Sequence, residues 1–255
     1  MSIDLDVSEG VARVTLNRPD RRNAIDRAAE ATLGEIWDRI EADPDIRCAV
    51  LTGAGQTFCA GADMKEEGVE GLEYWADADP WGFGGIALGG RLSVPLIARV
   101  NGPALGGGFE MVLGCDLVVA AENAVFGLPE PRVGRVPLDA RVALPRLIPR
   151  AQALGVLLTG RRIGVDEALS YGLINQVVPV DGLDAAVDSW VADVLACAPL
   201  SLKAVKRSVY DTAHMGLAEA RNARLPALTA ALRSRDADEG VLAFREKRAP
   251  VWTGS

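Results

Sequence analysis

Apolar residues recur along the chain with two different periods, and the order of these periods predicts the class of fold. From Ala29 to Ile40 they recur at the spacing of an α-helix, and Asp26 stands where a helix-capping residue is expected. Short apolar runs typical of strands lie on either side of this segment and further along the chain. Strands that alternate with helices indicate a layered α/β fold. We predict strands at 11–16, 46–52, 95–100 and 117–121 and helices at 26–42 and 107–114.

After about residue 150 the pattern becomes almost entirely helical. We divide the chain into a core domain at 1–195 and a helical C-terminal region at 196–255, in which we expect contacts between subunits. In this part of the chain we predict one strand at 174–178 and helices at 151–159, 166–171, 183–197, 200–212, 217–232 and 237–248.

Residues 64–90 form a long stretch without a regular period. It is rich in Gly and Asp and carries the aromatic residues Tyr74, Trp75, Trp81 and Phe83. Long irregular segments in compact domains are more often functional lids than linkers. We therefore predict a lid over a binding site, with a surface loop that packs on a neighbouring subunit as the alternative.

The composition fits a folded protein with an acidic surface. Of the 255 residues 49% are apolar and 24% are charged, so the chain can bury a sizeable core. The net charge of −8 argues against broad binding to nucleic acid or to an anionic membrane, because both require a basic surface. The first residues show no signal-peptide pattern, and no run of about 18 apolar residues occurs, so we expect a soluble, cytoplasmic protein.

Cysteine and histidine usage limits the chemistry. The four cysteines have no paired spacing, which argues against a zinc knuckle, a redox pair or a disulfide framework, and we expect buried thiols. His214 is the only histidine, so a His-rich metal site is excluded, and a hydrolytic triad would have to use that one residue. We expect no metal, and chemistry that uses carboxylates or the backbone.

Two glycine-containing loops, 57–65 and 101–110, follow predicted strands. Glycine lets a ligand approach the backbone closely, and N–H groups from two loops at one sheet edge can converge on a single oxygen atom. The alternative is that each loop is only a tight turn. The glycine runs are not nucleotide fingerprints, because the run at 53–58 lacks the third glycine of the dinucleotide motif and no glycine loop is followed by Lys-Ser or Lys-Thr in Walker spacing.

Two carboxylates, Glu110 and Glu130, stand beside these loops. Glu110 lies in an apolar helix start, where a carboxylate is costly to bury unless it is hydrogen-bonded, protonated or used. Glu130 lies in a Pro-flanked turn and could equally be a surface residue. Arg132 and Arg135 are close enough in sequence to pair with Glu130 and lower its pKa. Two carboxylates that face one cavity suit acid/base catalysis on water.

At these motifs the chain resembles the enoyl-CoA hydratase/isomerase (crotonase) family. Within the family, residues 81–85 and 250–252 look most like the carnitinyl-CoA dehydratase branch. The resemblance implies a spiral of repeated ββα turns, a helical C-terminal region that forms trimers and closes the site, and a homotrimer or dimer of trimers. It also implies an acyl-CoA substrate and no cofactor, since coenzyme A is part of the substrate. The matching motifs lie at 16–19, 23–24, 59–65, 101–110, 126–130, 158–161, 168–173 and 243–248.

The resemblance also implies roles for individual residues. The N–H groups of Ala62 and Gly107 would form an oxyanion hole for the thioester carbonyl, Glu110 would act as base, and Glu130 would donate a proton to C2. Contacts to coenzyme A are implied for Ala60, Asp63, Lys65, Phe244 and Lys247, the last two from a neighbouring subunit. The acyl pocket is predicted from Trp75, Trp81, Phe83 and Leu138.

The sequence departs from the family where many hydratases have a Gly-rich turn after the second Glu. Here Leu138, Asp139 and Arg141 follow Pro137, which places charge near the predicted cavity. Three activities stay open: hydration or dehydration across the 2,3 double bond of an enoyl-CoA, another reaction such as double-bond isomerisation or thioester hydrolysis, and acyl-CoA binding without catalysis. The paired glutamates favour the first.

Overall fold

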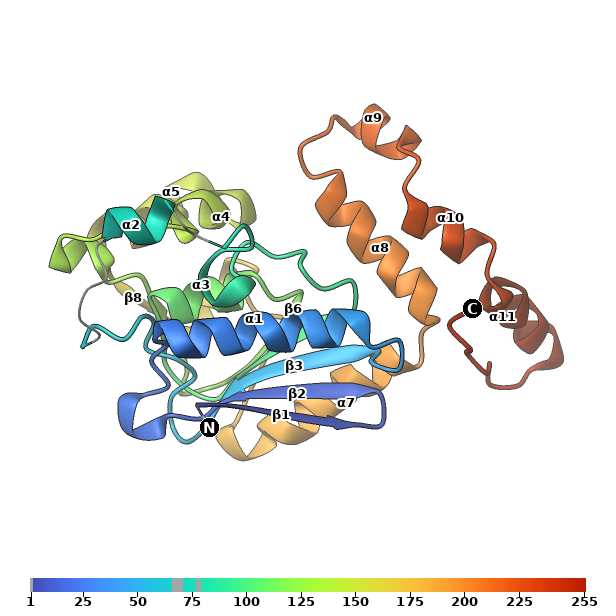
Figure 1. The fold of residues 1–255 in the computed structure, drawn as a ribbon, viewed down its shortest axis with the longest axis horizontal. Coiled ribbons are helices and arrows are strands. Elements are labelled where there is room, and N and C mark those ends of the chain that lie inside the picture. The colour runs from blue at the N-terminus through green and yellow to red at the C-terminus, as the bar shows by residue number, and fades with distance from the viewer. Residues whose placement is uncertain (1, 66–70, 77–78) are drawn as a thin grey trace.

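A six-stranded sheet forms the centre of the protein. The computed structural model describes residues 2–65, 71–76 and 79–255 (Figure 1). The first strand pairs antiparallel with the second, and all other neighbours in the sheet are parallel. The strands lie in the order β1 (Ile3–Ser8), β2 (Val11–Leu16), β3 (Cys48–Gly53), β4 (Leu96–Val100), β6 (Leu117–Ala121) and β9 (Gln176–Val178).

A second, smaller sheet continues the first at its carboxyl edge. It contains β5 (Ala104–Leu105), β7 (Val125–Gly127) and β8 (Arg162–Gly164). A strand of the large sheet is followed by a strand of the small sheet and then by a helix, as in β4, β5 and α3 (Gly107–Leu113). These are the repeated ββα turns that the family resemblance implied.

Helices cover both faces of the large sheet, which explains why a central strand such as β3 is apolar on both sides. Alternate residues of β3 belong to two separate cores: Ala49 and Leu51 face the side of α1 (Arg27–Ala42), and Cys48 and Val50 face α7 (Leu183–Leu195). The predicted cap of α1 is confirmed, because the Asp26 carboxylate accepts the Ala29 N–H at 2.8 Å.

Several short helices surround the carboxyl edge of the sheets (Figure 1). The predicted lid at 64–90 is not wholly irregular, since it contains α2 (Gly71–Ala76) and the 3₁₀ turn η2 (Phe83–Gly85), while residues 66–70 and 77–78 lie outside the described residues. The remaining helices here are α4 (Ala140–Leu147), α5 (Arg150–Thr159) and α6 (Val165–Ser170), with 3₁₀ turns η1 (Pro19–Arg21), η3 (Glu130–Val133) and η4 (Val180–Gly182).

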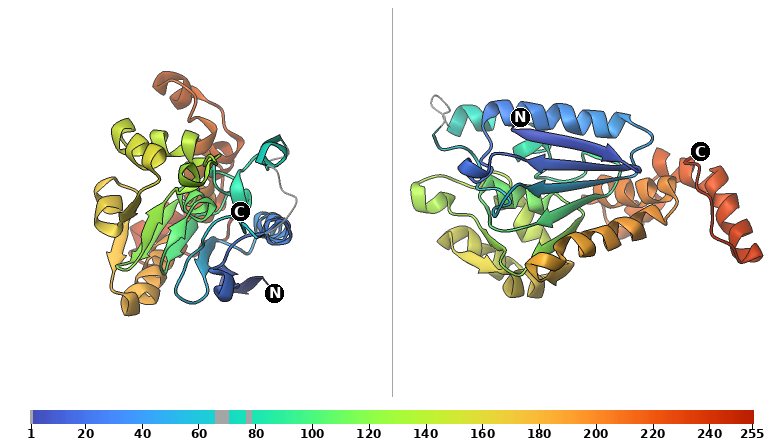
Figure 2. Two further views of the ribbon diagram at one scale, coloured as in Figure 1. Left: turned by 90° about the vertical axis from the view of Figure 1, so that its left-hand side faces the viewer. Right: turned by 90° about the horizontal axis from the view of Figure 1, so that it is seen from below.

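The C-terminal helices extend beyond the core, as Figure 1 and the right-hand view of Figure 2 show. They are α8 (Pro199–Asp211), α9 (Leu217–Asn222), α10 (Pro226–Leu232) and α11 (Arg235–Glu246). The prediction of one helix at 217–232 is wrong, because Leu225 is extended before Pro226. Within the described residues no single helix could span a membrane by length and apolarity; only the bent pair 180–195 and 199–211 passes that test together.

Three of the four cysteines are buried thiols, as predicted. Cys197 is exposed, so the prediction is wrong there; it lies just beyond the end of α7, and its thiol is within hydrogen-bond distance of the Asp193 carbonyl. The boundary between residues 195 and 196 stays a prediction.

A buried ion pair fastens α8 to the core. Lys206 Nζ lies 2.6 Å from Asp116 Oδ2 and donates to the Val94 carbonyl at 2.8 Å. The Asp116 carboxylate also accepts the Leu96 N–H at 2.7 Å and the Tyr210 hydroxyl at 3.1 Å. All of its oxygens are therefore partnered, which offsets the cost of removing the charge from water.

Replacing Lys206 by Met should lower the free energy of unfolding by about 3 kcal/mol, because it leaves the Asp116 carboxylate without its counter-ion. Urea denaturation followed by circular dichroism measures this change. Lys203→Met, on the same helix and outside any described ion pair, is the control and should unfold close to the wild type. Equal effects of the two substitutions would show that the ion pair does not hold α8 in place.

Candidate active site

The two glycine loops lie side by side, joined by backbone hydrogen bonds. Cys59 N–H donates to the Pro103 carbonyl at 3.2 Å, and Leu105 N–H donates to the Cys59 carbonyl at 2.9 Å. Next to them, Gly106 N–H donates to the Gly127 carbonyl at the end of β7 at 2.9 Å. The small sheet therefore brings together residues that follow β3, β4 and β6.

Glycine permits this close approach. Gly61 has a φ of +90° and Gly106 a φ of +55°, in the left-handed region that side chains disfavour. A Cβ atom at Gly61 would lie 2.9 Å from the Leu105 oxygen and 3.0 Å from the Gly107 nitrogen. The backbones of the two loops are thus in direct contact.

The N–H groups of Ala62 and Gly107 point to no acceptor among the described residues. On either side of the two loops' N–H groups, Asp63 N–H donates to the Ile25 carbonyl at 2.8 Å and Gly106 N–H donates to the Gly127 carbonyl at 2.9 Å, whereas Gly108 N–H, like that of Gly107, has no acceptor among the described residues. The structure places these two unbonded donors on loops that touch, and they are the donors predicted for the oxyanion hole.

The side chain of Asn23 fixes the backbone before and within the first loop, a role that was not predicted from the sequence. Its buried Nδ2 donates to the carbonyls of Ala54 at 2.9 Å, Thr57 at 2.7 Å and Phe58 at 3.2 Å. Its Oδ1 accepts the Arg18 N–H at 2.9 Å. The only signal in the sequence was its place in the 23–24 motif.

Glu110, on α3, is buried with 5% of its surface exposed. Its Oε1 accepts the N–H groups of Asp139 at 2.9 Å and Ala140 at 2.8 Å, at the start of α4. The first N–H groups of a helix lack partners within it, so the carboxylate completes the start of α4. Burial nevertheless raises the pKa of Glu110 to about 7, against the effect of these hydrogen bonds and with a smaller contribution from the negative charges of Asp139 and Glu130.

Glu130 opens the turn η3 and lies against the second loop. A Cβ atom at Gly106 would lie 2.7 Å from Glu130 Oε1, and Glu130 Oε2 is buried without a hydrogen-bond partner in the structure. Burial raises the pKa of Glu130. The prediction that Arg132 and Arg135 lower this pKa is wrong: Arg132 Nε instead donates to the Thr159 carbonyl at 2.9 Å, and neither arginine forms a described ion pair with Glu130.

The two glutamates are near enough for the charge of one to raise the pKa of the other. Both lie beside the loops that carry the free N–H groups. Two neighbouring carboxyl groups, both with pKa values raised by burial, suit paired acid and base chemistry, in which one group is protonated and the other ionised.

The residues predicted for the acyl pocket occupy different surroundings. Phe83 is buried, and its ring fills the space that a side chain at Gly107 would need. Trp81 and Leu138 are half-buried near the same edge of the sheets, whereas Trp75 on α2 is 54% exposed. Phe83 is thus brought to the site, and the pocket roles of the four residues stay predictions.

The residues predicted to contact coenzyme A are also divided. The Asp63 carboxylate accepts a hydrogen bond from Arg18 at 3.1 Å and another from Lys65 N–H at 3.1 Å, so it fixes the first loop. The pairing with Lys65 N–H and the Arg18 charge lower the pKa of Asp63. The Lys65 side chain is exposed. Phe244, 85% exposed, and Lys247 lie on or next to α11, which Figure 1 shows away from the loops of the same chain.

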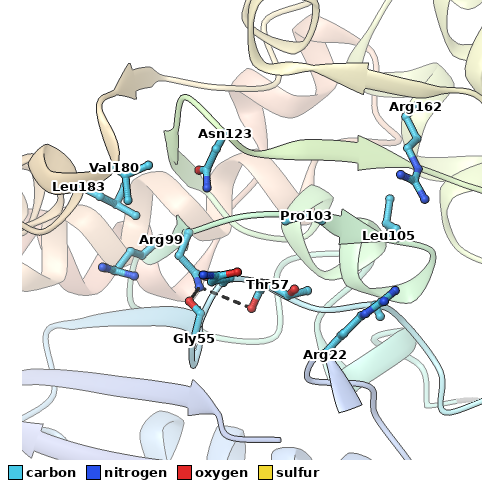
Figure 3. A pocket seen from close by; sticks show the side chains of 13 residues that line it. Arg22, Gly55, Thr57, Arg99, Pro103, Leu105, Asn123, Arg162, Val180 and Leu183 are labelled. Carbon is cyan, nitrogen blue, oxygen red and sulfur yellow. Dashed lines mark hydrogen bonds between the residues drawn. The ribbon is translucent and has the colours of Figure 1, made fainter. Parts of the chain in front are cut away.

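Ala60 lines a cavity of about 730 Å³ with three arginines at its walls (Figure 3). Arg99 pairs with Asp184 at 2.7 Å, while the side chains of Arg22 and Arg162 have no described partner. These arginines were not predicted as a group from the sequence. Arg99 lies 77 residues after Arg22 and 63 residues before Arg162, and only the fold brings the three together. Among the described residues, no group of three or more His, Cys, Asp or Glu side chains could hold a metal ion.

A sequence model described as enoyl-CoA hydratase/isomerase matches residues 6–255. The chain belongs to the enoyl-CoA hydratase/isomerase family. The family that the motifs predicted is thereby confirmed, together with its α/β spiral fold.

Relatives within the family match over their whole length. The chain is 42% identical to (E)-benzylidenesuccinyl-CoA hydratase of Thauera aromatica, covering 100% of both proteins. It is 40% identical to carnitinyl-CoA dehydratase of Escherichia coli K12, covering 99% of this chain and 98% of that protein. The crystal structure of enoyl-CoA hydratase from Bacillus anthracis superposes with a TM-score of 0.92 at 32% identity, covering 100% of both chains.

The raised pKa of Glu110 predicts a pH-dependent stability. The folded protein binds this proton more tightly than the unfolded chain, whose pKa is near 4.5, so the stabilisation is complete below pH 4.5 and is lost as the pH rises through about 7. Relative to Glu110→Gln, the wild type should lose roughly 3 kcal/mol across this range. Urea unfolding of both proteins at several pH values measures the difference. Glu122→Gln, at an exposed turn, should follow the wild type; a pH-independent gap for Glu110→Gln would contradict the assignment.

Proposed function

We propose that the protein is an enoyl-CoA hydratase or dehydratase, which adds water across the 2,3 double bond of an enoyl-CoA thioester or removes it. The observation that carries the proposal is a pair of carboxyl groups, the buried Glu110 and the half-buried Glu130 with its buried Oε2, beside two backbone N–H groups without acceptors among the described residues. The names of the relatives from Thauera aromatica and Escherichia coli, a hydratase and a dehydratase of CoA thioesters, support the same reaction.

In the proposed mechanism the thioester oxygen lies between the N–H groups of Ala62 and Gly107. Addition at C3 moves negative charge onto this oxygen, and donors already aimed at it stabilise the enolate more than the ground state. One such donor typically contributes about 3 kcal/mol to the transition state. The loops supply these donors from the backbone, so their side chains can remain small.

The two glutamates divide the proton transfers. Glu110, with a pKa of about 7, accepts a proton from water as the hydroxyl oxygen bonds to C3. Glu130 carries the proton that is delivered to C2 as the enolate collapses, and its buried Oε2 without a hydrogen-bond partner favours the protonated form. Dehydration runs through the same steps in reverse. Isomerisation would need only one such group, so the second buried carboxylate favours hydration.

The proposal places the phosphates of coenzyme A at the cavity lined by Arg22, Arg99 and Arg162. Ala60 lines this cavity and lies two residues before Ala62, and Leu105 lines it two residues before Gly107. A ligand whose carbonyl occupies the oxyanion hole can therefore extend into it. Unpaired guanidinium groups suit phosphate, which they bind with two parallel hydrogen bonds.

The proposal also includes a cytoplasmic homotrimer, or a dimer of trimers, formed through the C-terminal helices. Large apolar side chains are exposed along these helices, and water-exposed apolar patches are typical of subunit contacts. Such an assembly would bring Phe244 and Lys247 to a neighbouring subunit's coenzyme A. The exposed apolar residues are Val205, Val209, Leu217, Leu228, Leu232, Val241, Leu242 and Phe244.

Loss of absorbance of the conjugated thioester tests the reaction with crotonyl-CoA, longer 2-enoyl-CoAs and crotonobetainyl-CoA. The wild type should turn over at least one of them. Glu110→Gln and Glu130→Gln should each slow kcat by about 100-fold to 10,000-fold, because each removes one proton-transfer group. Glu122→Gln, an exposed carboxylate, should match the wild type. Tight acyl-CoA binding without turnover of any substrate would overturn the proposal.

Replacing Arg162 by Gln should raise KM by about tenfold and leave kcat unchanged, because the lost charge–phosphate contact is the same in ground state and transition state. Steady-state kinetics on the best substrate measures both constants. Arg150→Gln removes an exposed arginine outside the cavity and should leave KM at the wild-type value. An unchanged KM for Arg162→Gln would remove the cavity from the coenzyme A site.

A further inference from the structure

Asp139 stands at the first turn of α4, where many members of the family have a glycine-rich turn. An Asp at this place usually caps its own helix through its side chain. Here it does not, because its backbone is already helical, with φ −95° and ψ −44°, and the side chain makes no capping hydrogen bond. The carboxylate turns to another segment of the chain.

That segment is 81–85, the glycine-rich part of the predicted lid. Asp139 Oδ2 accepts the N–H of Phe83 at 2.7 Å, across 56 residues of sequence. Gly82 and Gly84 have φ values of +77° and +62°, and a Cβ atom at Gly82 would lie 2.7 Å from Asp139 Oδ2. The left-handed glycines therefore shape this segment so that the carboxylate can reach its backbone.

Both ends of Asp139 touch parts of the site. Its backbone N–H donates to Glu110 Oε1 at 2.9 Å, so it holds the proposed base. Its carboxylate fixes Phe83, whose ring fills the space directly beside Gly107, the proposed oxyanion donor. One residue thus connects the acid/base half of the site to the oxyanion half.

We propose that Asp139 is a positioning residue of the hydration reaction, which sets the distance between the Glu110 carboxylate and the oxyanion hole by clamping Phe83 against Gly107. The inference rests on the proposed function. It assigns to Asp139 a role that a glycine turn cannot perform, since glycine offers a backbone N–H and no carboxylate.

The charge of Asp139 gives the contact between Asp139 and Phe83 a second measurable effect, on the pKa of Glu110. Asp139 raises the pKa of Glu110, as does Glu130, while Asp139 itself faces Arg141 and Asp79. Asp139→Asn keeps an oxygen that can accept the Phe83 N–H and removes the negative charge. The pKa of Glu110 should then fall, and the acid limb of kcat/KM should move to lower pH.

The experiment compares kcat/KM over pH for four variants with the wild type on its best enoyl-CoA. Asp139→Ala and Gly82→Ala break the clamp from opposite sides, and each should lower kcat/KM by about 100-fold, the loss typical of a misplaced catalytic group. Asp139→Asn should keep the plateau within about threefold, because the clamp remains, and shift the acid limb. Asp166→Asn, the same change at an exposed first helical turn, should match the wild type. Circular dichroism melting curves identify any variant that fails to fold.

Wild-type turnover in Asp139→Ala, or an unmoved acid limb in Asp139→Asn, would overturn the inference while leaving the hydratase proposal intact. If the wild type turns over no enoyl-CoA, the proposed function fails, and the contact between Asp139 and Phe83 is tested by binding of butyryl-CoA instead.

Asp139→Ala should then bind butyryl-CoA about tenfold more weakly than the wild type, because Phe83 is no longer held in place. This is a difference of about 1.4 kcal/mol. Equal affinities would overturn the clamp as well.

Discussion

The backbone hydrogen bonds of Cys59 with Pro103 and Leu105 are the constraint on which the site depends. Parallel strands end at one edge of a sheet, so β3 and β4 deliver their loops to the same place, but only this pairing brings the loop backbones into contact. Gly61 and Gly106 then allow the approach, and β7 adds Glu130 from the next turn of the spiral. The reactive groups are a consequence of how the small sheet continues the large one.

Buried charge in this protein is tolerated in two different ways. Asp116 is surrounded by donors, among them Lys206 and a tyrosine hydroxyl, and contributes to the docking of α8. Within the part of the chain that the structure describes, Glu110 has two backbone donors and no counter-ion, and Oε2 of Glu130 has no hydrogen-bond partner. Incomplete pairing of buried carboxylates is costly to a fold, and it is concentrated here at the site where proton transfer is proposed.

The sequence predicted the large elements because their apolar periods are long enough to read. The capped helix α1 and the strands β2, β3, β4, β6 and β9 followed from the apolar pattern, whereas β1 was not predicted. The strands β5, β7 and β8 have two or three residues each, too few to show a period. The helix α4 was missed, since its proline at position 145 and its charged residues obscure the apolar pattern.

Tertiary contacts explain the remaining differences at the site. Nothing local indicates that the Asp139 carboxylate reaches Phe83, or that Arg132 turns to the Thr159 carbonyl and leaves Glu130 alone. Arg22 and Arg162, far apart in sequence, line one cavity in the folded chain. Proximity in sequence predicted that an arginine would pair with Glu130 and lower its pKa. In the folded chain partial burial raises that pKa instead.

The hydrogen bonds from the start of α4 to Glu110 give one carboxylate two duties, since it completes a helix and is the proposed base. The ionised form that accepts protons is also the form that burial disfavours. The stability of the fold and the proposed activity therefore make opposite demands on Glu110, as at many enzyme sites. Directed evolution guided by heat resistance alone would tend to replace the residue that the chemistry requires.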